Sequence, residues 1–114
     1  MRREYSFFNV DIADLGGVSI SFAAFQRFQE KHPEALQKHN RFSQNQQFFI
    51  SYGTVWRNLA KEETVKQRLL IDPHSPGEFR ADGPLSNLTE FHNEFGVKEG
   101  DRMFASVEDR VTIW

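Results

Sequence analysis

Residues 72–80 constrain the fold more than any other part of the chain, because they hold two prolines and a glycine within five positions. Pro73 and Pro76 fix their own φ angles and push the residues before them toward extended backbone geometry. This pattern argues against both a regular helix and a central β-strand, and it predicts a stiff, irregular loop. His74 and Arg80 lie on this loop.

Two interpretations of the loop follow from its residues. In the first, it is a buried structural connection in which Arg80 pairs with a carboxylate. In the second, its rigidity serves to present an imidazole and a guanidinium to a ligand. Spacing alone favours the structural interpretation, since site predictions from one sequence are weak.

The rest of the chain has the apolar spacing of amphipathic helices. The first predicted helix spans residues 12–29, with an apolar face of Leu15, Val18, Phe22, Phe25 and Phe28. The second begins after Ser43, which forms a capping-box pattern with Gln46. Its expected face comprises Phe48, Tyr52, Val55 and Leu59, with Phe49 and Trp56 beside it. Gly53, within this helix, is a candidate position for a close helix crossing.

Two further helices follow. One is expected from Glu62 to about Leu70, and another is expected to be capped by Ser86 or Asn87 and to end at Gly96. Residues 110–114 are expected to form a short extended tail. We therefore predict an all-α domain of about four helices, with one proline-rich irregular loop and a core rich in the chain's 12 phenylalanines.

Composition excludes several classes of function. One domain is expected for 114 residues, and the net charge of −2 gives no sign of nucleic-acid binding. The chain has no cysteine, so it has neither a disulfide framework nor a thiolate metal site. It also has no apolar run near the roughly 20 residues that a transmembrane helix requires.

The loop motif Asp-x-His-Ser-Pro-Gly-x-Phe-Arg, with Gly83-Pro84-Leu85-Ser86-Asn87 after it, resembles the C-terminal region of the neprilysin/endothelin-converting-enzyme family of zinc metallopeptidases. Ile12-Ala13-Asp14-Leu15-Gly16-Gly17 resembles the end of that family's Glu-Asn-Ile-Ala-Asp signature. Gln47-Phe48-Phe49, Val55-Trp56 and the final Trp114 recur at the family's spacing. The resemblance covers residues 11–114, and we expect residues 1–10 to be an unrelated leader.

The resemblance implies that this helical domain is part of a larger thermolysin-like catalytic domain that cleaves peptides with zinc-activated water. Secreted animal members of the family contain disulfides, so the absence of cysteine suggests a bacterial type. The family is typically extracytoplasmic, although Glu4 and Asn9 interrupt what would be the apolar part of a signal peptide.

The zinc-binding residues of the family are missing from this sequence. Family members hold zinc with a His-Glu-x-x-His helix and a glutamate on a second helix. None of His32, His39, His74 and His92 belongs to such a motif. Val10 stands at the position of the glutamate ligand, and Asp11 is rotated about 100° around a helix from it. We therefore expect no metal ligand and no bound zinc in this chain.

Three residues match the family's catalytic positions. Asp14 corresponds to a carboxylate that orients a zinc-bound histidine and contacts the loop arginine. His74 corresponds to the histidine that donates a hydrogen bond to the oxyanion of the reaction intermediate. Arg80 corresponds to the arginine that binds a carbonyl of the substrate backbone. The structural alternatives are a helix-terminal carboxylate for Asp14, a loop histidine bonded to its own backbone for His74, and an Asp14–Arg80 ion pair.

Four other side chains are assigned to structural roles. His32 and His39 are expected in solvent, His92 at the surface or rim of a helix, and Trp56 in the core rather than in a substrate pocket.

The sequence thus predicts the C-terminal fragment of a zinc metalloendopeptidase, which is inactive without the N-terminal catalytic part. Peptides are the expected substrates of the whole enzyme. The alternative function is a non-catalytic module that binds peptides or forms homo-oligomers through an exposed apolar face.

Overall fold

The computed structural model describes the backbone of residues 2–36 and 41–112, and the side chains of residues 12–35 and 41–112. This part of the chain contains helices and loops but no β-strand. The elements are α1 (Arg2–Lys31), the 3₁₀ turn η1 (Pro33–Leu36), α2 (Gln44–Val55), α3 (Glu62–Ile71), α4 (Gly77–Ser86) and α5 (Thr89–Phe95). The predicted all-α class is confirmed, with one α-helix more than expected.

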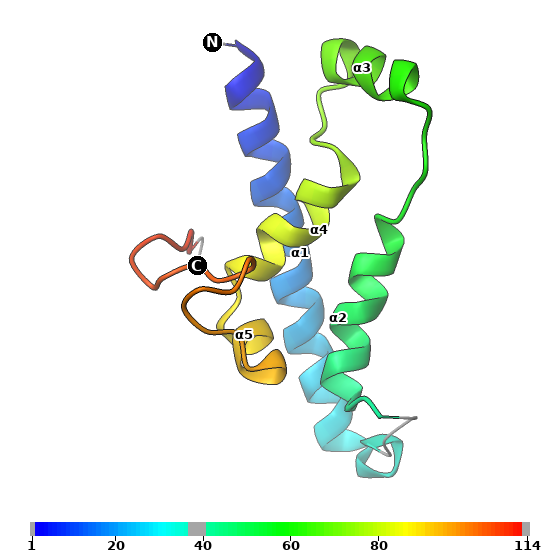
Figure 1. Ribbon diagram of the computed structural model, residues 1–114. Coiled ribbons are helices and arrows are strands. Elements are labelled where there is room, and N and C mark those ends of the chain that lie inside the picture. Colours follow the sequence, from blue (N-terminus) through cyan, green and yellow to red (C-terminus); the bar gives the residue numbers. More distant parts are fainter. Residues whose placement is uncertain (1, 37–40, 113–114) are drawn as a thin grey trace.

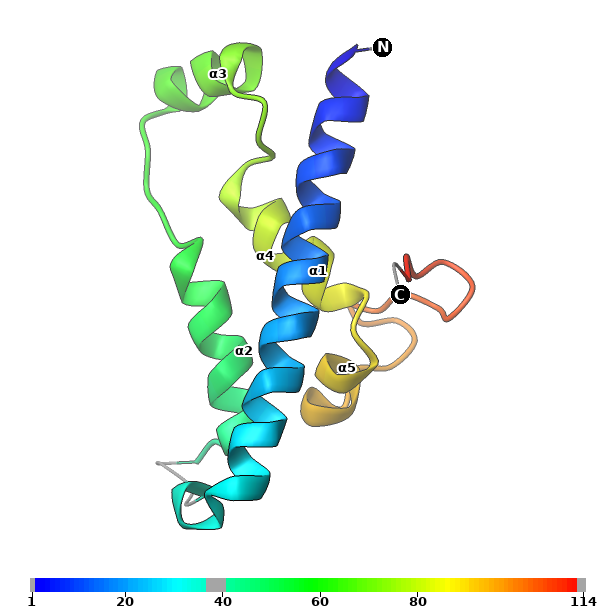
Figure 2. The ribbon, with the colours of Figure 1, turned by 180° about the vertical axis from the view of Figure 1, so that it is seen from behind.

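Helix α1 runs along the length of the molecule and organises the other helices (Figure 1). Helix α2 lies antiparallel beside its C-terminal half, α4 packs across its middle, and α5 lies near the opposite flank (Figure 2). Helix α3 stands apart at the end of the molecule where the N-terminus lies. Its described side chains include none that is buried, so α3 is joined to the rest mainly through its two connecting loops.

An aromatic cluster at the junction of α1, α2 and α5 forms the core. The ring of Phe49 is only 1% exposed, stacks 4.8 Å from that of Phe22 and meets the edge of Phe91 at 5.5 Å. Offset and edge-to-face contacts are the favoured arrangements of aromatic rings. The other buried apolar residues of this core are Leu15, Val18, Leu85 and Leu88.

The start of α2 agrees with its predicted capping box. The Ser43 hydroxyl accepts from the Gln46 amide, and the Gln46 side chain accepts from the Ser43 amide. The end of α2 differs from the prediction, because the helix stops at Val55. Leu59 lies beyond the helix, and both Val55 and Leu59 are exposed rather than part of a continuous apolar face.

A close backbone contact accompanies the early end of α2. A Cβ atom placed on Gly77 would lie 2.6 Å from the carbonyl oxygen of Trp56, so the chain passes directly against the first turn of α4. Tertiary packing thus ends α2 at Val55, although the apolar spacing of the sequence continues to Leu59. A Cβ on Gly53 would meet nothing within 4 Å, so the proposed close crossing at that glycine is wrong for the described part of the chain.

The proline-rich loop is shorter than predicted. Only residues 72–76 are irregular, and α4 begins at Gly77, so a loop extending to Arg80 is wrong. Pro76 is the N-cap of α4, where its missing N–H breaks no helical hydrogen bond. A proline would interrupt a helix if it lay inside it, but a helix can begin at the residue that follows a proline, as α4 does after Pro76.

Helix α5 ends as predicted but begins differently. Gly96 adopts a left-handed conformation with φ 61° at the C-cap, which a glycine favours. The N-cap is Leu88, not Ser86 or Asn87. The side chains of these two residues instead donate to carbonyls of α4, those of Asp82 and Gly83.

His92 is buried, and its predicted surface position is wrong. The residue is only 5% exposed. Its ring Nε2 lies 2.8 Å from the Ser86 carbonyl oxygen, and its Nδ1 lies 3.0 Å from Arg110 Nη2. The contacts come from residues 6 and 18 positions away, which a helical pattern does not encode. His32 is exposed as predicted, whereas His39 and the end of the predicted tail at Trp114 lie outside the described residues.

Candidate functional site

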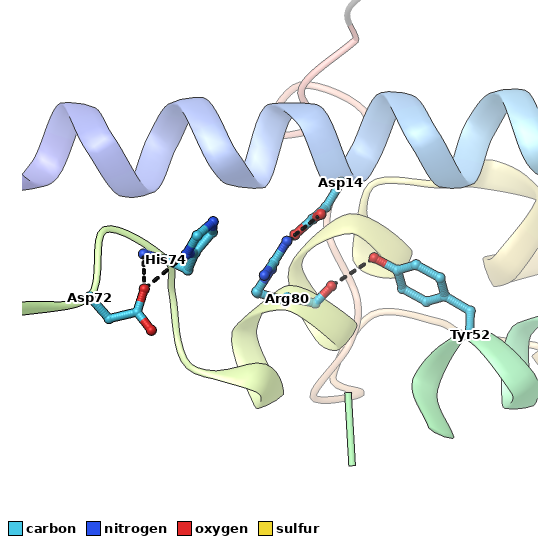
Figure 3. Close-up of polar contacts among 5 residues, drawn as sticks. All are labelled: Asp14, Tyr52, Asp72, His74 and Arg80. Carbon is cyan, nitrogen blue, oxygen red and sulfur yellow. Dashed lines mark hydrogen bonds and ion pairs between the residues drawn. The ribbon is translucent and has the colours of Figure 1, made fainter. Parts of the chain in front are cut away.

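Arg80 and Asp14 form a bidentate ion pair between the first turn of α4 and the middle of α1. Arg80 Nε lies 2.6 Å from Asp14 Oδ2, and Nη2 lies 2.8 Å from Oδ1 (Figure 3). The side chains are only 19% and 13% exposed, respectively. Two parallel N–H···O bonds fix both the position and the plane of the guanidinium. The predicted ion pair is therefore present.

The flat face of the same guanidinium rests on Trp56. The central carbon of the Arg80 guanidinium lies 3.9 Å from the centre of the Trp56 ring, within the range of a cation–π contact. Trp56 is half-buried and borders a cavity, so its expected place in the core is wrong. The indole N–H is buried and has no hydrogen-bond partner.

His74 lies on the irregular loop and is held by Asp72. Its ring Nδ1 is 2.8 Å from Asp72 Oδ1, and its backbone amide donates to the same oxygen at 2.9 Å. These bonds lower the pKa of the Asp72 carboxyl, first through the His74 amide and then through the ring. The His74 side chain is 49% exposed, and its ring points toward α1, as does the side chain of Arg80 (Figure 3).

A cavity of about 200 Å³ brings these groups together. Its lining includes His74, Arg80, Asp72 and Trp56, together with the apolar side chains Val65 and Leu69 of α3. The site combines hydrogen-bonding groups with an apolar wall, as is usual for ligand pockets. Two predicted site residues, His74 and Arg80, line this cavity, and Asp14 supports Arg80 from α1.

Sequence reasoning missed two supporting residues. Asp72 carries a local signal, because an aspartate two residues before an amide commonly accepts its hydrogen bond. Tyr52, whose hydroxyl lies 2.8 Å from the Arg80 carbonyl, carries none, because its partner is 28 residues away.

The described side chains include no group of three or more His, Asp or Glu residues that could hold a metal ion. Asp14 is already engaged by Arg80, and His74 by Asp72. This donor set does not fit a zinc site. Among the described helices, none is both long and apolar enough to cross a membrane.

Comparison with known proteins gives a consistent set of matches. The family model for peptidase family M13 matches residues 4–111. This match includes most of the segment for which the sequence predicts a leader. The chain is 39% identical over 94 residues to an endothelin-converting enzyme homolog of Locusta migratoria. It is 33% identical over 104 residues to a neutral endopeptidase of Lactococcus lactis.

A solved structure matches the fold as well. The zinc metalloprotease Zmp1 of Mycobacterium tuberculosis, in its open state, aligns with 96% of the chain at a TM-score of 0.88 and 33% identity. The chain spans only a small part of these proteins: 13% of the locust protein, 15% of the Lactococcus protein and 17% of the Zmp1 chain.

Proposed function

Because the chain belongs to peptidase family M13, we propose that it supplies substrate and transition-state contacts to a zinc-dependent endopeptidase whose metal is held by residues outside this chain. The zinc would provide the activated water. The observation that supports this role is the cavity where His74 and Arg80 meet, with Arg80 already oriented by Asp14. We further propose that the chain by itself has no peptidase activity.

Arg80 is suited to bind a peptide carbonyl. Asp14 engages Nε and Nη2 of the guanidinium, and Trp56 supports its face. A guanidinium held in this way loses little side-chain entropy when it accepts a further ligand. The carboxylate of Asp14 also offsets the charge that Arg80 would otherwise leave in a poorly solvated position.

His74 is suited to face a developing negative charge. Because a carboxylate only accepts hydrogen bonds, the contact with Asp72 places a proton on Nδ1. Donation from Nε2 to an oxyanion then requires the doubly protonated imidazolium. The contact with Asp72 and the proline-flanked loop keep the ring near its place.

The test is peptide binding to the purified chain, followed by ¹H–¹⁵N NMR of the Arg80 side chain. We expect short peptides to perturb the Arg80 Nε–H signal, and Arg80→Ala to weaken binding by about tenfold or more, as expected for a charge-assisted hydrogen bond. Arg102→Ala is the matched control, because that arginine is exposed outside the cavity. Equal affinities of the two variants would exclude Arg80 as the peptide contact.

Peptidase activity is a separate measurement. We expect no cleavage of a fluorogenic peptide by the purified chain, with or without added zinc. Robust cleavage that a chelator abolishes would contradict the proposed division between this chain and the metal site.

A self-associating module is the second candidate. The described part of the chain exposes large apolar side chains on α1 and α3, among them Ile20, Leu70 and Ile71. Such surface favours association when it is contiguous. Light scattering during size-exclusion chromatography discriminates the two candidates, because a concentration-independent monomer would argue against self-association.

A further inference from the structure

The main-chain carbonyl of Arg80 receives its hydrogen bond from another helix. The Tyr52 hydroxyl on α2 lies 2.8 Å from this oxygen (Figure 3). In a regular α-helix the donor would be the amide four residues later, and in α4 that residue is Pro84. Proline has no N–H, so the Arg80 carbonyl lacks its ordinary helical donor. The Tyr52 hydroxyl donates to this carbonyl in place of the amide that Pro84 lacks.

Pro84 is a fixed part of the packing. It is one of the largest fully buried residues of the described part of the chain. The side of α4 that carries the Arg80 carbonyl faces α2, because Tyr52 reaches it directly. A partly buried carbonyl is costly to leave without a donor, so the contact from Tyr52 compensates for the amide that Pro84 lacks.

Tyr52 of α2 and Trp56, the C-cap of that helix, contact Arg80 at different points. Tyr52 and Trp56 are four residues apart and lie on the same side of the helix, with ring centres 6.3 Å apart. Tyr52 binds the backbone of Arg80, whereas Trp56 supports the guanidinium face. Asp14 of α1 holds the edge of the guanidinium. Arg80 is thereby held by both neighbouring helices.

We propose that Tyr52 is a positioning residue for Arg80: its hydroxyl replaces the helical donor that Pro84 lacks, and so fixes the first turn of α4 with the guanidinium between Asp14 and Trp56. This inference rests on the proposed function in one respect: the proposed function supplies the reason to hold Arg80 in place, which is contact with a peptide. Tyr52 itself touches no reacting group.

The first experiment is Tyr52→Phe in the full chain, observed by NMR. Loss of the hydroxyl should shift the ¹³C signal of the Arg80 carbonyl, which responds to hydrogen bonding. It should also speed exchange of the Arg80 Nε–H with water by roughly two- to tenfold, as expected for one lost hydrogen bond. Unchanged Arg80 signals in a folded Tyr52→Phe variant would overturn the proposal.

Ser86→Ala is the matched control. Its hydroxyl also donates to a main-chain carbonyl of α4, that of Asp82, at 2.6 Å. The substitution removes the same chemical group from the same region but not from Arg80. We expect it to shift the Asp82 carbonyl signal and to leave the Arg80 Nε–H exchange unchanged. If Arg80 Nε–H exchange quickened equally in both variants, the cause would be a general loosening of α4 rather than the loss of the Tyr52 hydroxyl. That result would overturn the proposal.

Pro84→Ala tests the reason for the contact. Alanine restores an N–H that can donate to the Arg80 carbonyl. In this background, Tyr52→Phe should therefore have less than half of its effect on Arg80 exchange. The same effect in both backgrounds would show that Tyr52 does not substitute for the missing donor. If Pro84→Ala does not fold, the Arg80 carbonyl shift in Tyr52→Phe still decides the proposal.

Peptide titration separates this inference from the proposed function. A response of Arg80 to Tyr52→Phe, without any response to peptides, would support positioning and contradict peptide contact. A response of Arg80 to peptides, with none to Tyr52→Phe, would support peptide contact and overturn positioning.

Discussion

Two arginine–histidine regions of this molecule differ in the chemistry of their partners. Arg80 and His74 border a cavity and contact carboxylates, those of Asp14 and Asp72. In the described structure, Arg110 and His92 instead join the C-terminal tail, residues 97–112, to α5. Their partners are neutral groups. The Arg110 partners are the Ala105 carbonyl, the Thr89 hydroxyl and the ring of His92.

The comparison separates a site from a structural junction. In the junction, His92 donates from Nε2 to the Ser86 carbonyl and accepts from Arg110 at Nδ1, so both ring nitrogens are used and the ring is neutral. In the site, the imidazole of His74 is half exposed and faces a cavity. Hydrogen bonds from an arginine to neutral acceptors stabilise a fold, whereas ionisable groups beside a cavity are typical of binding and catalysis.

Asp14→Ala should produce the largest effect on the cavity region. It removes the carboxylate that neutralises a poorly exposed guanidinium, which costs about 3 kcal/mol in free energy of unfolding. Urea denaturation measures this change. The surface ion pairs of Arg102 with Glu78 and Asp82 are the matched comparison, and Arg102→Ala should leave the midpoint unchanged within error. Equal losses for both variants would contradict the distinct role of the buried pair.

Gly77→Ala should be nearly as damaging. The added Cβ would lie 2.6 Å from the Trp56 carbonyl oxygen, so α4 must move away from α2 at a cost of about 1–3 kcal/mol. We also expect the Arg80–Trp56 contact to loosen, which would alter tryptophan fluorescence. Gly83→Ala is the control, since a Cβ at Gly83 would meet nothing within 4 Å. A Gly77→Ala variant as stable as the native chain would show that this close approach is not required.

Arg110→Ala tests the junction. It removes two hydrogen bonds that join the tail to α5, those to Thr89 and His92, and one within the tail, to the Ala105 carbonyl. We therefore expect amide exchange to quicken in residues 97–112 and a loss of about 1–2 kcal/mol in the free energy of unfolding. The cavity should be unaffected, with Arg80 Nε–H exchange as in the native chain. A change at Arg80 of the same size as in the tail would show that the two regions are coupled.

The smallest predicted effect concerns pH. Because the folded-state pKa of Asp72 is lowered, its carboxylate favours the folded state above the ordinary Asp pKa of about 3.9, and this contribution disappears as the pH falls through the lowered value. NMR titration of the Asp72 carboxyl should give a midpoint below that ordinary value. His74→Ala should raise the midpoint only in part, because the amide of residue 74 remains. A midpoint at the ordinary value in the native chain would contradict the Asp72–His74 contacts.

Local sequence signals predicted much of the fold. The Ser43–Gln46 capping box, the glycine stop at Gly96 and most of the apolar face of α1 each depend on residues within a few positions. Phe28, the last residue of that predicted face, is 49% exposed, so the prediction is wrong there. Predictions failed where distant residues decide the outcome. His92 is buried by contacts with Ser86 and Arg110, and the end of α2 coincides with the approach of Gly77.

By itself, the sequence determined an all-α domain, the family and the pairing of Asp14 with Arg80, because periodicity, caps and motifs are local patterns or resemblances along the chain. Only the tertiary structure decided that α4 starts immediately after Pro76 and that Tyr52 completes its hydrogen bonding. The physical reason is that every buried carbonyl needs a donor. When proline removes the local donor, the replacement can come from any helix that packs close enough, and spacing along the chain does not reveal which one.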